Sequence, residues 1–142
     1  MNNIALISCV SQKEIYRTMA ENMYTSSLFI KSLKYVKSIL KPHKIYILSA
    51  KYGLLKLDEE IEPYNETLNG KTKQQKIDWS NIILQQLKKN CNINEDRFIF
   101  LAGRNYYEYL TPYLPNKIIL MENLPIGKRL QWLNGELNER LL

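Results

Sequence analysis

The segment KIYILS at residues 44–49 decides the fold class, because it is almost continuously apolar and ends on a small hydroxyl residue. Three further runs of the same character occupy residues 4–8, 97–102 and 117–121. Continuous apolar runs of this length are typical of strands that are buried on both faces of a parallel sheet. We therefore expect four strands in a mainly parallel sheet.

Amphipathic stretches separate these four runs. Apolar residues recur at helical spacing in residues 26–40, 73–89 and 126–141, and residues 106–114 have the pattern of a shorter helix. Strands that alternate with helices predict a three-layer α/β domain. The 142 residues contain no linker, repeat or low-complexity tract, so we expect a single domain over residues 1–142.

The composition excludes several classes of protein. Hydrophobic residues make up 45% and charged residues 24%, with only five Gly and five Pro, which excludes collagen-like and intrinsically disordered chains. The net charge of +6 favours a phosphate-bearing partner such as nucleic acid, or else reflects solvated, lysine-rich helix faces. No apolar run is long enough to predict a membrane-spanning segment.

The cysteine and histidine content bears on metals and on cell compartment. Cys9 and Cys91 form no CxxC pair and His43 is the single histidine, so we expect no metal and no cofactor. Two unpaired cysteines and the absence of a secretory leader predict a cytoplasmic protein. Cys9 follows a predicted strand and is either a nucleophile or, more commonly, a buried structural thiol. The sequence leaves a homo-oligomer open.

Small, cationic and aromatic residues follow each predicted strand. The C-terminal ends of parallel strands meet at one edge, where open α/β sheets bind their ligands. Hydroxyls, cations and tyrosine rings suit an anion with a planar group attached, which predicts a nucleotide or nucleoside ligand. Ordinary turn and cap chemistry is the alternative interpretation. The predicted substrate-binding residues are Ser8, Cys9, Lys13, Ser49, Tyr52, Gly53, Tyr64, Gly103, Arg104, Tyr106, Gly127 and Arg129.

Glu62 and Lys51 are the predicted catalytic residues. Glu62 precedes Pro63, which stiffens the backbone, and it lies in the only long segment predicted to be irregular, residues 56–72. A fixed carboxylate can act as a general base or stabilise a cationic sugar transition state. Lys51 belongs to the neighbouring loop in the sequence.

Six motifs resemble a bacterial and phage family of unknown function. They are LISCVSQK (6–13), MYTSSLF (23–29), YILSAKYGLL (46–55), IEPYNETL (61–68), LAGRNYYEYL (101–110) and LPIGKRLQWL (124–133). The resemblance implies a Rossmann-like fold and no established reaction. The family is distantly similar to a domain of archaeosine synthase and, through it, to uracil-DNA-glycosylase-like folds, which implies chemistry on nucleobases. Asn65 departs from the Asp of the family pattern, and residues 121–124 replace its Pro-Leu-x-Gly turn.

These observations lead to three hypotheses about function. The first is an enzyme that acts on a nucleobase-containing substrate (a nucleotide, a nucleoside or a base in nucleic acid), through N-glycosidic bond or base-modification chemistry. The second is a non-catalytic nucleotide-binding sensor or sponge module in phage defence or counter-defence. The third is a nucleic-acid-binding domain whose affinity falls steeply with salt.

Overall fold

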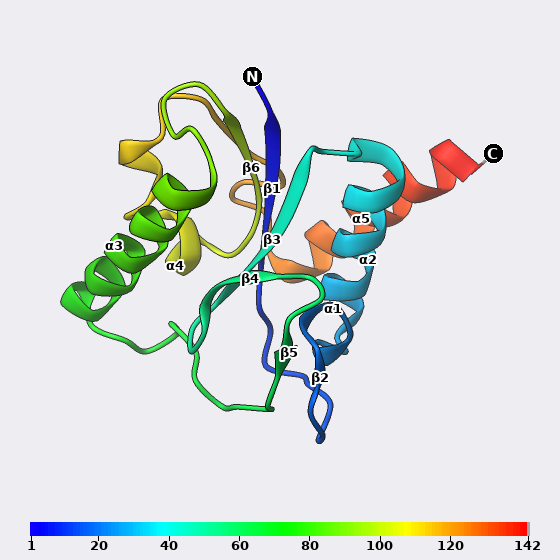
Figure 1. Ribbon diagram of the computed structural model, residues 1–142. Coiled ribbons are helices and arrows are strands. Elements are labelled where there is room, and N and C mark those ends of the chain that lie inside the picture. Colours follow the sequence, from blue (N-terminus) through cyan, green and yellow to red (C-terminus); the bar gives the residue numbers. More distant parts are fainter. Residues whose placement is uncertain (142) are drawn as a thin grey trace.

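A five-stranded mixed sheet forms the middle layer of the molecule, as the computed structural model shows for residues 1–141, with side chains described up to residue 138 (Figure 1). The strand order is β4-β3-β1-β6-β7. Four strands are parallel, namely β1 (Asn3–Ser8), β3 (Lys44–Ser49), β6 (Arg97–Leu101) and β7 (Lys117–Ile119), and β4 (Gly53–Lys56) pairs antiparallel with β3. The expected α/β class and mainly parallel sheet are confirmed.

The expected number of four strands is wrong, because residues 53–56 form a fifth. A tight turn returns the chain after Ser49, and Gly53 begins β4 at a φ of 75°. Glycine adopts this left-handed conformation without the steric cost of a Cβ atom. The arrangement is therefore Rossmann-like only in outline, since one edge of the sheet is an antiparallel hairpin.

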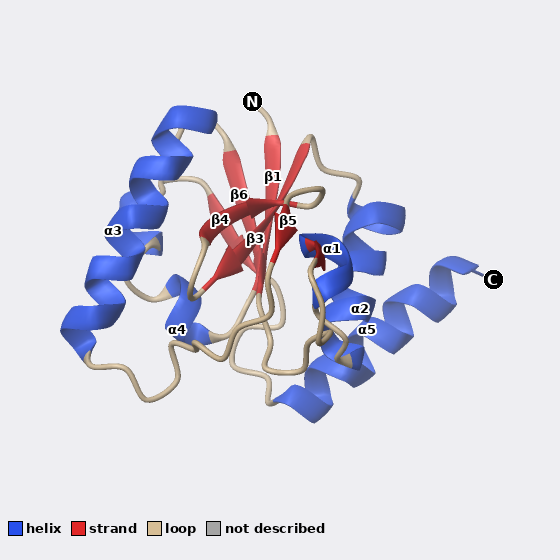
Figure 2. Ribbon diagram, turned by 60° about the horizontal axis from the view of Figure 1, so that its bottom comes forward, coloured by secondary structure: helices blue, strands red, loops and turns tan. Residues whose placement is uncertain are grey.

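Helices cover both faces of the sheet (Figure 2). On one face, α2 (Ser27–Tyr35) packs against α5 (Ile126–Leu141), with the short α1 (Ala20–Met23) beside them. The other face carries α3 (Lys73–Asn90) and the short α4 (Arg104–Tyr107). Three layers result, as the alternation of strands and helices predicts.

Local sequence explains where these helices begin and end. The Ser26 hydroxyl accepts a hydrogen bond from Phe29 N–H at the start of α2, and Thr72 and Gln75 form a capping box at the start of α3. The helix predicted over residues 26–40 ends in a π-helical turn at Val36–Leu40. The one predicted over residues 106–114 is wrong in extent, because α4 ends at Tyr107 and a separate 3₁₀ turn, Thr111–Tyr113, contains Pro112.

A second, two-stranded sheet lies beside the main one. β2 (Thr18–Met19) pairs antiparallel with β5 (Glu60–Ile61), so the segment predicted to be irregular contains a short strand. This pairing ties the loop after β1 to the segment that follows β4.

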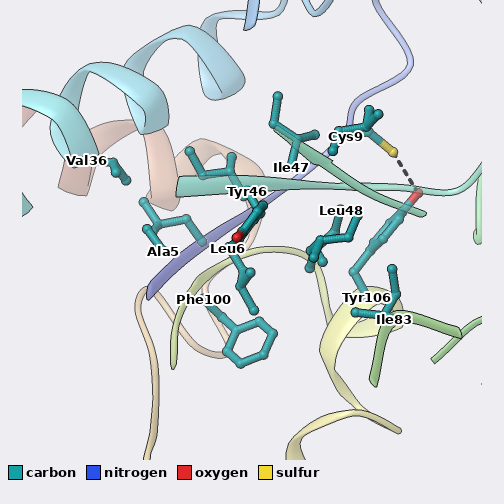
Figure 3. Close-up of a cluster of buried hydrophobic side chains, with 14 of the residues drawn as sticks. Ala5, Leu6, Cys9, Val36, Tyr46, Ile47, Leu48, Ile83, Phe100 and Tyr106 are labelled. Atoms are coloured by element: carbon teal, nitrogen blue, oxygen red, sulfur yellow. Dashed lines mark hydrogen bonds between the residues drawn. The ribbon is translucent and has the colours of Figure 1, made fainter. Parts of the chain in front are cut away.

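The core lies between the sheet and both helical layers. Leu6, Ile47 and Phe100 come from three adjacent strands, and Val36 and Ile83 meet them from opposite layers (Figure 3). The central strands are buried on both faces, which accounts for their continuous apolar sequences. Among the described residues, no helix combines the length and apolar character that a membrane span requires.

The order in which strands join the sheet changes side between β1 and β6, although the two strands are parallel. After β1 the chain passes through α2 to β3 on one side of β1, and after β4 it passes through α3 to β6 on the other side. Such a switch point leaves a crevice at the C-terminal ends of the two strands, and open α/β sheets bind ligands there.

Candidate functional site

A cavity of about 400 Å³, which we call the inner cavity, opens at the C-terminal ends of β1 and β6. This volume is within the usual range of small-molecule sites. Its walls come from the loop after β1, the segment 65–69, α2 and the starts of α4 and α5. The lining residues are Ser8, Cys9, Val10, Ser11, Lys13, Leu28, Asn65, Glu66, Thr67, Asn69, Gly103, Tyr106, Ile126 and Arg129.

Hydrogen bonds fix the floor of this cavity. Cys9 N–H donates to the carbonyl of Leu48 at 2.9 Å, which extends the β1–β3 pairing by one residue. Gly103 N–H donates to the Ser8 hydroxyl at 3.4 Å and so connects the loops after β6 and β1. The Cys9 thiol donates to the Tyr106 hydroxyl at 3.4 Å (Figure 3). The floor therefore joins two strand ends that are far apart in the sequence.

Tyr106 holds the wall of the cavity in place. Its hydroxyl accepts a hydrogen bond from Leu68 N–H at 3.3 Å, and its ring packs edge-on against Trp79 at 5.4 Å between centroids. Burial raises the pKa of Tyr106, so its hydroxyl stays protonated at neutral pH. The ring is buried, which restricts its ligand contacts to the part that faces the cavity.

Lys13 is a half-buried cation in this cavity. Its Nζ lies 4.5 Å from the centroid of the Tyr64 ring and 5.9 Å from that of Tyr24, and it donates to the carbonyl of Ser11 at 3.3 Å. Among the described residues, no carboxylate forms an ion pair with it. Burial lowers the pKa of Lys13, while the neighbouring Cys9 acts in the opposite direction.

A network of hydroxyl groups lies behind Lys13. The Tyr64 hydroxyl is 2.6 Å from that of Tyr24 and accepts a hydrogen bond from the Ser49 hydroxyl at 2.8 Å. The Ser49 carbonyl accepts a hydrogen bond from Trp79 Nε1 at 2.9 Å. Burial raises the pKa of both tyrosines, so the network is uncharged at neutral pH. Ser49 and Tyr64 thus support the cavity without lining it.

Lys51 lies in a second hollow, of about 520 Å³, on the outer side of the segment 65–69. Lys71 and Tyr64 also line this hollow. The Lys51 ammonium is exposed and lies 5.4 Å from the centroid of the Tyr52 ring. The Tyr52 hydroxyl is fixed by the backbone of Glu62, with Glu62 N–H at 3.2 Å. Neither Lys51 nor Tyr52 lines the inner cavity.

Two carboxylates of the same segment have different surroundings. The Glu62 side chain is 57% exposed and pairs with Arg17 at 3.2 Å, outside the cavity. Glu66, four residues later, is also exposed and lines both the inner cavity and the hollow beside Lys51. The catalytic role of Glu62 stays a prediction, and Glu66 is the carboxylate of this segment that borders the inner cavity. Glu66 was not predicted from the sequence, because no proline or other local signal marks it as Pro63 marks Glu62.

The predicted cations of the last two loops also differ. Arg129 lines the cavity, and its Nε donates to the carbonyl of Leu124 at 2.8 Å. Arg104 pairs with Glu108 at 3.4 Å and its side chain is 72% exposed. Gly127 is exposed and does not line the cavity.

The structure therefore divides the predicted binding residues into two groups. One group lines the inner cavity and consists of Ser8, Cys9, Lys13, Gly103, Tyr106 and Arg129. The other supports it or lies outside it and consists of Ser49, Tyr52, Gly53, Tyr64, Arg104 and Gly127. Where side chains are described, no three His, Cys, Asp or Glu residues gather in a way that would hold a metal ion.

Comparison with known families adds one finding. The sequence model of a family of unknown function (DUF6884) matches residues 4–135. The chain belongs to this family. All the residues that line the inner cavity of this DUF6884 domain fall within the matched range. No curated protein matches the chain.

Proposed function

We propose that this DUF6884 domain is an enzyme that binds a nucleobase-containing substrate in the inner cavity and acts at or near its N-glycosidic bond. One observation carries the proposal, namely a cavity of about 400 Å³ at the switch point between β1 and β6 that contains two cations. Open α/β sheets bind nucleotides at this position.

The lining residues match the parts of a nucleotide. Arg129 supplies positive charge for a phosphate, and the hydroxyls of Ser8 and Ser11 can donate to phosphate or ribose oxygens. The apolar side chains of Val10, Leu28 and Ile126 offer contact area for a base. Binding of this kind needs a ligand that is anionic at one end and planar at the other.

Glu66 is the carboxylate that we assign to the chemistry. A carboxylate at the sugar activates water or stabilises the oxocarbenium-like transition state that forms as the bond to the base breaks. The motif resemblance to archaeosine synthase and to uracil-DNA-glycosylase-like domains supports a base-linked reaction by analogy.

A panel of nucleoside monophosphates, nucleosides and short oligonucleotides tests this proposal. Binding is measured by calorimetry, and release of free base is followed by chromatography. We expect one monophosphate to bind and to lose its base, and the variant Glu66→Gln to bind it without releasing base. Unchanged base release in that variant would overturn the assignment of Glu66.

A non-catalytic nucleotide-binding module is the second candidate. It is favoured by the position of Glu62 and Lys51, the two residues predicted to be catalytic, outside the inner cavity. Such a module would bind a nucleotide from the same panel tightly and return it intact. The ratio of released base to recovered ligand separates the two candidates.

Nucleic acid is a further candidate ligand for the same face. Lys51 and Lys71 line the second hollow, which lies next to the inner cavity. The segment 65–69 forms a wall of both. A strand that occupied both hollows would contact several cations at once. Its affinity would then fall with salt, with a log–log slope of about −0.7 for each phosphate neutralised on a single strand.

A further inference from the structure

Lys13 differs from the other lysines of the chain in its surroundings. It is the lysine that lines the inner cavity, and it is half-buried. Other described lysines form polar contacts at the surface, as Lys37 does with Glu21 and Lys31 with Asn134. Lys13 instead faces two tyrosine rings and a backbone carbonyl.

The surroundings of Lys13 provide little to stabilise a positive charge. The Tyr24, Tyr64 and Ser49 hydroxyls behind it bond to one another and are uncharged. The Tyr64 ring, 4.5 Å away, attracts the ammonium through its π-electrons. Burial lowers the pKa of Lys13, so a larger fraction of its amine is neutral than in a fully hydrated lysine. Lysines desolvated in this way are the ones that act as nucleophiles.

We propose that Lys13 is the nucleophile of the inner cavity and forms an imine with C1′ of the sugar of the ligand. This inference rests on the proposed function for the identity of the ligand. Its own geometric basis is the position of the Lys13 amine in the inner cavity, where it forms no ion pair with a carboxylate in the described part of the chain. Arg129 and Glu66 line the same cavity.

The bond changes balance without an oxidant or a reductant. The neutral amine of Lys13 attacks C1′, the bond from C1′ to the base breaks, and the base leaves with the electron pair. The proton displaced from the attacking nitrogen passes to the base. The bond from C1′ to the ring oxygen then opens, the oxygen takes a proton from the solvent, and a protonated imine remains, whose hydrolysis returns that proton to the solvent. Water hydrolyses the imine, which releases the sugar and restores Lys13.

Charge alone would assign Lys13 a different role. If it only held a phosphate, arginine could still supply the charge and bind the phosphate. The guanidinium of arginine does not lose its proton in proteins, so it cannot form an imine. Substitution by arginine therefore distinguishes a nucleophile from an anion ligand.

Reductive trapping tests the inference. The full chain is incubated with ribose 5-phosphate or 2-deoxyribose 5-phosphate, each of which exposes an aldehyde at C1, in the presence of cyanoborohydride. Peptide mapping by mass spectrometry then locates the reduced adduct. We expect one adduct, at Lys13, and at least about tenfold less labelling of the Lys13→Arg variant. The matched control is Lys88→Arg, an exposed lysine of α3, which should label like the unmodified chain.

Four outcomes would each be decisive. Equal labelling of Lys13 and Lys88 in the unmodified chain, a measurement that needs no variant to fold, would overturn the inference. Unchanged labelling of a folded Lys13→Arg variant would overturn it as well. Base release from nucleotides without any trapped adduct would overturn the imine and leave the proposed function standing. An adduct at Lys13 without base release from any nucleotide would instead support the nucleophile and overturn the nucleobase chemistry.

Discussion

Two loops at the same edge of the sheet have similar sequences but different structural roles. The loop after β1 contains Ser8, Cys9 and Lys13, and the loop after β3 contains Ser49 and Lys51. Each has a small polar residue followed by a lysine within five positions. The first loop lines a cavity of about 400 Å³, whereas Ser49 of the second is completely buried.

The difference arises from where the chain goes after each strand. After β1 the chain leaves the sheet and continues through α1 and α2 before it returns as β3, so the space at the end of β1 stays open. After β3 it turns back at once to form β4, and the Ser49 hydroxyl accepts hydrogen bonds from the N–H groups of Lys51 and Tyr52. In this chain, the strand end followed by a crossover borders an open cavity, and the strand end followed by a hairpin is part of the core.

Glu66 and Glu62 provide the largest test of this contrast. We expect Glu66→Gln to lower the rate of base release by about 100-fold or more, because it removes the carboxylate of the cavity. Glu62→Gln should have a much smaller effect, since its carboxylate faces Arg17. Single-turnover assays with the monophosphate that binds best would measure both rates. A larger loss in Glu62→Gln would return the catalytic role to the residue predicted from the sequence.

Arg129 and Arg104 extend the contrast to binding. Arg129→Ala should weaken binding of a nucleoside monophosphate by about 1.5–3 kcal/mol, the usual contribution of a hydrogen bond to a charged group. Arg104→Ala should leave the affinity unchanged, because its guanidinium pairs with Glu108 outside the cavity. Calorimetric titration of the two variants with the same ligand compares them directly. Equal weakening would mean that the ligand reaches beyond the inner cavity.

Much of the framework could be predicted from the sequence because it depends on local patterns. Continuous apolar runs identified β1, β3, β6 and β7, and parallel strands necessarily bring their C-terminal ends to one edge. That rule alone placed Ser8, Gly103 and Arg129 near one another, although they come from distant parts of the chain.

The missed features depend on contacts that a local pattern does not contain. β4 is four residues long and follows a tight turn, so its two leucines looked like part of a loop. Strands of two residues, such as β2 and β5, form only because the two segments meet in space. Glu66 was missed for a similar reason, since the path of the segment 65–69 over the cavity is set by the hydrogen bond from Leu68 to Tyr106.

Ser49 and Ser8 test the contrast through stability. Ser49→Ala removes a buried hydroxyl that bonds Tyr64 at 2.8 Å, and should lower the free energy of unfolding by about 1–3 kcal/mol. Ser8→Ala removes one long contact at 3.4 Å beside the open cavity and should cost about 0.5 kcal/mol. Urea denaturation of both variants measures the difference. If Ser8→Ala proved the more damaging, the loop after β1 would be the better packed of the two.

Gly53 and Gly103 give the smallest expected difference and the most local one. Gly53 has a φ of 75°, and a Cβ there would lie 2.7 Å from Oε1 of Gln86, which accepts a hydrogen bond from Leu54 N–H. Gly53→Ala should therefore cost about 1–2 kcal/mol, the usual penalty of a left-handed conformation for a residue with a Cβ. Gly103 has a φ of −70° and open space around the position of a Cβ. Gly103→Ala should change the free energy of unfolding by no more than about 0.5 kcal/mol. Thermal denaturation of the two variants measures the difference. Equal losses of stability would contradict the prediction, because they would mean that the hairpin turn after β3 is as unconstrained as the loop after β6.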